Sequence, residues 1–103
     1  MMSESQTITE LNLPKFHVGE HLALELEELG MTGRQFAKAI GVSPNRITEV
    51  LSGKRRLTED TAVKIARYLG TTPNIWLDLQ TDYLVAIAEK KLDAANIRKS
   101  KSL

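Results

Sequence analysis

The stretch TGRQFAKAIGVSPNRITEVLSG, residues 32–53, decides the fold. It contains two short segments with apolar residues at helical spacing, joined by a turn with a glycine. Thr32 and Gln35 form the T-x-x-Q pattern of a capping box, which predicts a helix start. Ser43 before Pro44 predicts a second start, because serine caps helices and proline lacks an N–H that the first turn does not use. Two helices joined by a tight turn are the arrangement that places one helix in the DNA major groove.

Three further helices are expected around this pair. Leu22, Leu26 and Leu29 follow an i, i+4, i+7 spacing, which predicts a helix with a buried leucine stripe over residues 19–29. Thr58 is expected to cap another helix, and a Thr-Pro pair at residues 72–73 begins a longer last one. No segment shows the strict alternation of a strand pair. The sequence therefore predicts an all-α, five-helix domain with a long C-terminal helix.

Length and composition fit one small domain, with 103 residues, 42% of them hydrophobic, and no cysteine. Without disulfides or thiolate metal sites, the domain must fold by helix packing, assisted by self-association. We expect the folded part to span residues 17–92, between flexible tails at 1–16 and 93–103. The opening residues are acidic and no apolar run reaches the ~20 residues of a membrane span. We therefore expect no secretory signal, no membrane contact and a cytoplasmic protein.

The near-neutral net charge of +1 conceals a segregation along the chain. Residues 1–30 hold six acids against one lysine, whereas residues 31–70 hold eight Lys or Arg against three acids. Ordinary solvated helix faces explain each charge singly but explain the segregation less readily. A basic middle beside an acidic N-terminal third predicts a polyanion for one face and a different partner for another.

The helix after Ser43 has a polar outer face. A helical wheel turns Ile47, Val50 and Leu51 inward. The side chains that then point outward can all form hydrogen bonds: Asn45, Arg46, Thr48, Glu49 and Ser52. Such groups read base edges in the major groove, and the residue at the helix start enters deepest. We predict base contacts from Pro44, Asn45, Arg46, Thr48 and Glu49. Alternatively, Glu49 pairs with Arg46 or a nearby lysine and repels incorrect DNA.

Candidate phosphate contacts surround this face, since cations and helix N-termini bind phosphate without reading sequence. The predicted set is Arg34, Gln35, Ser43, Lys54, Arg55 and Arg56. The run at 54–56 is the strongest part of the set because it directly follows the reading helix with no intervening acid. Lys38 fits a solvated surface as well as a phosphate contact.

The predicted last helix carries two apolar stripes. Trp76, Leu79, Tyr83 and Ile87 lie on one face, and Leu77, Leu84 and Ala88 lie about 100° around the helix. One stripe suffices to dock a helix on its own domain. The second predicts a homodimer interface formed by Leu77, Leu84 and Ala88. The alternative is a single, wide stripe that faces the core.

The chain resembles the lambda-repressor-like, or Xre-type, helix-turn-helix domains, and within them the HigA/VapI-type antitoxins. The resemblance spans about residues 17–90. Its most specific part is G-K-R-R-L-T at 53–58, followed by G-T-x-P-x-x-W-L-x-L-Q at 70–80; the A-x-x-x-G-V-S piece at 37–43 is generic. Departures from the family pattern fall in the first helix, at Val18, His21 and Leu24, and bear on a toxin interface rather than on DNA binding.

The resemblance implies a dimer that binds a palindromic operator on double-stranded DNA and represses its own operon. It also implies neutralisation of a RelE-like, mRNA-cleaving toxin by direct binding. Carried over onto matching positions, Gln35 would hold phosphate, and Pro44, Asn45, Arg46, Thr48 and Glu49 would face bases. The resemblance also suggests an interpretation of the charge segregation. The acidic N-terminal third would bind a basic surface of the nuclease.

Three alternatives compete with this interpretation. His17-Val18-Gly19-Glu20-His21 matches the zinc peptidase pattern H-x-x-E-H, which we reject because a glycine lies inside it and the chain is too small for the rest of such an enzyme. No other catalytic motif is present, so neither an enzyme nor a cofactor is expected. A stand-alone Xre-type repressor without a toxin partner is the main rival. A pure protein-interaction module is a weaker one.

Overall fold

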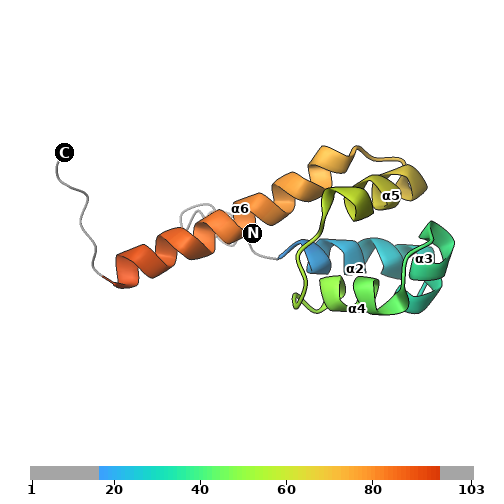
Figure 1. Ribbon diagram of the computed structural model, residues 1–103, viewed down its shortest axis with the longest axis horizontal. Coiled ribbons are helices and arrows are strands. Elements are labelled where there is room, and N and C mark those ends of the chain that lie inside the picture. Colours follow the sequence, from blue (N-terminus) through green and yellow to red (C-terminus); the bar gives the residue numbers. More distant parts are fainter. Residues whose placement is uncertain (1–16, 96–103) are drawn as a thin grey trace, which may run out of the picture.

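A computed structural model describes residues 17–95, which form five α-helices and no strand. The helices are α2 Val18–Leu29, α3 Gly33–Ile40, α4 Pro44–Leu51, α5 Glu59–Leu69 and α6 Pro73–Ala94. Figure 1 shows α2, α3 and α4 grouped together, with α5 above them and α6 leading away. The all-α, five-helix prediction is confirmed. The predicted flexible tails, 1–16 and most of 93–103, lie outside the described residues, and α6 continues to Ala94, past the expected boundary.

The helices begin at the predicted caps. Thr32 Oγ1 accepts from the Gln35 N–H at 3.0 Å, and Gln35 Oε1 accepts from the Thr32 N–H at 2.9 Å, which completes the capping box. Ser43 Oγ accepts from the Arg46 N–H at 3.2 Å at the start of α4. Thr58 caps α5 in the same way. Local side-chain chemistry therefore fixes where the two helices of the central motif begin.

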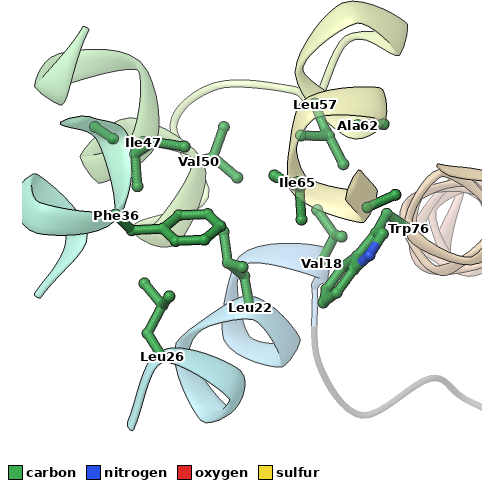
Figure 2. Close-up of a cluster of buried hydrophobic side chains, with 12 residues drawn as sticks. Val18, Leu22, Leu26, Phe36, Ile47, Val50, Leu57, Ala62, Ile65 and Trp76 are labelled. Atoms are coloured by element: carbon green, nitrogen blue, oxygen red, sulfur yellow. The ribbon is translucent and has the colours of Figure 1, made fainter. Parts of the chain in front are cut away.

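The core lies between α2, α3, α4 and α5 and is closed by Trp76 from α6 (Figure 2). Phe36, Ile47 and Ile65 are fully buried in it. The predicted leucine stripe of α2 is wrong at Leu29, which is 48% exposed. The chain turns immediately after Leu29, and the half-buried Met31 packs against the core there instead.

Helices α2 and α4 pack closely against each other at Gly19. A Cβ atom at this position would overlap the carbonyl oxygen of Val50 and lie 2.8 Å from that of Leu51. Only a residue without a side chain lets the two helix backbones come so near. Gly19 therefore sets the depth at which α4 lies against the domain, and so how far its outer face projects.

Helix α6 is attached to the domain by its first half. Gln80 is buried, and its Oε1 accepts from the Leu57 N–H at 2.6 Å while its Nε2 donates to the Leu57 carbonyl at 2.9 Å. The second half of α6 extends beyond the other helices (Figure 1). None of the described helices combines the length and apolar character needed to span a membrane.

Candidate nucleic-acid interface

The outer face of α4 is uncovered by the rest of residues 17–95. Asn45, Thr48 and Ser52 are exposed along it. Thr48 Oγ1 donates to the Asn45 carbonyl at 3.2 Å, and Ser52 Oγ donates to the Glu49 carbonyl at 3.2 Å. Their hydroxyl protons are thus used within the helix, which leaves the oxygen lone pairs to accept, while the Thr48 methyl lies toward Gly33 at the start of α3. Asn45, with an amide that both donates and accepts, is the most versatile group on this face.

Two of the predicted base-contacting residues lie at the edge of the face. Arg46 is half-buried, and its Nη1 donates to Thr61 Oγ1 of α5 at 3.4 Å. Glu49 is half-buried and forms an ion pair with Arg55 at 2.7 Å. The alternative interpretation of Glu49 anticipated a basic partner, but that partner is Arg55 rather than Arg46 or a lysine. Both side chains are therefore held in place, whereas Pro44 and Asn45 are exposed at the start of α4.

The predicted phosphate ligands near the helix starts keep free donor groups. Arg34 and Gln35 are exposed at the first turn of α3. Gln35 uses its Oε1 in the capping box, so its amide N–H groups are left to donate. Ser43 accepts from a backbone N–H through Oγ, so its own O–H is likewise left to donate. Gln35 and Ser43 thus serve both in helix caps and as candidate anion ligands.

The basic run at 54–56 is folded onto the end of α4. The Lys54 and Arg55 N–H groups both donate to the Glu49 carbonyl, at 2.8 and 3.2 Å. Gly53 permits this turn with a φ of 82°, in the left-handed region. All three basic side chains are exposed. They line a groove of about 380 Å³ together with Tyr83 and Ile87 of α6.

The residues of the predicted dimer stripe differ in their surroundings. Leu77 is half-buried and packs against the core of its own chain. Leu84 is half-buried and lines the groove just described, and Ala88 is exposed. Sequence reasoning missed Val85 and Leu92, which are 48% and 51% exposed. Their i, i+7 spacing with Ala88 between them is the signal that could have found them.

The H-x-x-E-H stretch serves the helix start. His17 caps α2, its Nδ1 accepting from the Gly19 N–H at 3.0 Å. Its ring meets that of Tyr83 edge-on, with centroids 5.9 Å apart. Between residues 17 and 95, no three His, Cys, Asp or Glu side chains are grouped so that they could hold a metal ion. His17 is therefore a capping and packing residue that joins α2 to α6.

Known proteins are similar to this chain in both sequence and architecture. The helix-turn-helix family model matches residues 22–76. Virulence-associated protein I of Dichelobacter nodosus is 40% identical over 86 residues, which make up 82% of this chain and 80% of that protein. The structure of a HigA-family addiction module antidote protein from Coxiella burnetii has a TM-score of 0.79 at 39% identity, covering 88% of this chain and 99% of that one. Pseudomonas aeruginosa antitoxin HigA, solved with the higBA promoter, gives 0.78 at 27% identity over 87% of this chain and 98% of that one.

The capped α3–α4 pair, with the outer face of α4 open, defines a helix-turn-helix domain. The chain belongs to the Xre-type helix-turn-helix family, in the group that includes the HigA antitoxins and virulence-associated protein I. The family resemblance noted in the sequence is confirmed.

Proposed function

We propose that this protein is a sequence-specific DNA-binding antitoxin that represses its own operon as a homodimer on a palindromic operator. The observation that carries the proposal is the uncovered polar face of α4, bordered by cations at the start of α3 and at residues 54–56. Pro44, Asn45 and Thr48 contact base edges directly. Arg34, Gln35, Ser43, Lys54 and Arg56 contact phosphates and fix the register. The function is one of binding rather than catalysis.

Asn45→Ala should weaken operator binding by about 1–3 kcal/mol and relax the preference at one base pair, because an Asn amide pairs with adenine through two hydrogen bonds. The matched control is Asn74→Ala, an exposed asparagine at the start of α6. Titrations against the promoter region of its own gene measure the loss of affinity. Titrations against single base-pair variants of the site that the protein protects in footprinting measure the loss of base preference. Equal losses on every sequence would show that Asn45 reads no base.

The dimer is proposed to form through the exposed stripe of α6 that contains Val85, Ala88 and Leu92, with Leu84 at its border. Three observations support it: the stripe is apolar, it is exposed in the single chain, and it lies on the half of α6 that extends beyond the other helices (Figure 1). Leu77 contributes less than the sequence predicted, since it packs on its own core.

Val85→Asp combined with Leu92→Asp should give a folded monomer, since both residues are exposed and the core does not use them. Light scattering measures the mass, and footprinting should then show loss of the paired half-sites about one helical turn, ~34 Å, apart. Lys90 lies about 140° around α6 from Val85, so Lys90→Asp serves as the control. A double variant that stays dimeric would place the interface elsewhere.

For the toxin, we propose that the outer face of α2 binds a basic RelE-like ribonuclease. Leu24 is 53% exposed among the exposed acids Glu20, Glu27 and Glu28. The more N-terminal acids Glu4 and Glu10 lie outside the described residues. An apolar side chain ringed by carboxylates suits a basic partner with a small apolar pocket.

Leu24→Asp should abolish co-elution with a toxin encoded beside this gene while leaving operator affinity unchanged, because α4 lies on another face. Ala23→Asp, one position away, is the control for added charge. The rival function, a stand-alone Xre-type repressor, predicts that no neighbouring gene product co-elutes with the wild-type protein while operator binding persists.

A further inference from the structure

Four donors from the segment after α4 converge on Glu49. The Ser52 hydroxyl and the Lys54 and Arg55 N–H groups donate to its backbone carbonyl at 3.2, 2.8 and 3.2 Å. The Arg55 side chain then donates to its carboxylate. The segment thus folds around Glu49, and this backbone contact places the Arg55 side chain beside the carboxylate.

The contact between the two side chains is one-sided. Arg55 Nε donates to Glu49 Oε1 at 2.8 Å, and Arg55 Nη2 lies 2.7 Å from the same oxygen. Arg55 therefore does not use Oε2. Two nitrogens of a planar guanidinium anchor this oxygen more firmly than a single charge can, and they leave Oε2 available to accept another hydrogen bond.

Glu49 stands one helical turn after Asn45 on the same side of α4. A carboxylate at this position faces a groove lined by phosphates, so it needs compensation for their repulsion. It also needs a fixed orientation if it is to distinguish one base edge from another. Arg55 supplies the compensating charge, and its two nitrogens hold Oε1 in place, which restricts where Oε2 can point.

We propose that Arg55 is a positioning residue for base recognition: it holds the Glu49 carboxylate so that Oε2 accepts a hydrogen bond from a cytosine amino group in the major groove. The proposal rests on the proposed function of operator binding. A fixed carboxylate favours a base that presents an amino donor and rejects one that presents only acceptors, such as guanine. Arg55 then acts through Glu49 rather than through a phosphate, in contrast to the prediction from the sequence.

The experiment compares wild type, Glu49→Gln, Arg55→Ala and the double variant on the operator and on all single base-pair substitutions of one half-site. Lys54→Ala, in the same loop, is the matched control. Thermal unfolding of each variant identifies any loss of stability. Wild-type binding tests the proposed function by itself, and only the pattern among the variants tests the role of Arg55.

We expect Glu49→Gln and Arg55→Ala to lose about tenfold discrimination at the same base pair, with the double variant no worse than either. Arg55→Ala should leave the salt dependence of binding unchanged, whereas Lys54→Ala should lower its slope by about 1 and weaken all sequences alike. The role of Arg55 is overturned if Arg55→Ala behaves like Lys54→Ala, since the ion pair then opens to hold a phosphate. It is also overturned if Arg55→Ala lowers stability and leaves the base preference intact. If the wild-type protein binds no DNA site preferentially, the proposed function and this inference are both wrong.

Discussion

Gly19→Ala is expected to destabilise the protein by about 3 kcal/mol or more, the upper range for overpacking a closely packed interior. The added methyl overlaps the carbonyl oxygen of Val50, a backbone atom that no rotamer change can move away. Helices α2 and α4 must therefore separate, which disturbs the core around Ile47 and Val50. Urea denaturation monitored through Trp76 measures the change in the free energy of unfolding.

Gly30→Ala is the matched control. Gly30 has a φ of 69°, but nothing lies within 4 Å of a Cβ at this position. Its replacement should cost about 1 kcal/mol from backbone strain alone. If the two alanine variants are equally stable, the close approach of α2 and α4 is not what positions the reading helix.

Gln80→Leu should cost about 2–4 kcal/mol, because it leaves the N–H and the carbonyl of buried Leu57 without their partner. Leucine is close to glutamine in size, so the loss comes from the hydrogen bonds rather than from a cavity. Thermal unfolding measures the effect, and Thr81→Ala, at an exposed neighbouring position, should stay within about 0.5 kcal/mol of wild type.

Gln80→Leu also tests how the basic loop is held. Leu57 directly follows Arg56, so Gln80 fixes the end of the 54–56 run relative to α6. We expect the folded variant, below its unfolding transition, to bind DNA more weakly on all sequences. A variant of wild-type stability would contradict the structural role given to Gln80.

The helix starts were predictable because each depends on residues a few positions apart. Thr32 with Gln35, and Ser43 with Pro44, encode their caps locally. The outer face of α4 followed from the same local geometry, since a helical wheel needs only the spacing of Ile47 and Val50.

What escaped prediction depends on the path of a loop or on where distant segments meet. The Glu49–Arg55 pair requires the path of the turn through Gly53, with its left-handed φ. The Gln80 contact joins residues 23 positions apart in sequence. The wheel of α6 could not show that Leu77 packs on its own core, because that depends on where α5 lies beside it.

We infer that the outer face of α4 is the surface that meets DNA. The direct measurement is a titration of the isotope-labelled protein with a duplex of its footprinted operator, following the backbone amides and the Asn45 side-chain amide by NMR. We expect the largest shifts over residues 43–56 and at the first turn of α3, with α2 unchanged on its outer side. Shifts confined to α2 or to the second half of α6, with Asn45 and Thr48 unmoved, would contradict the account.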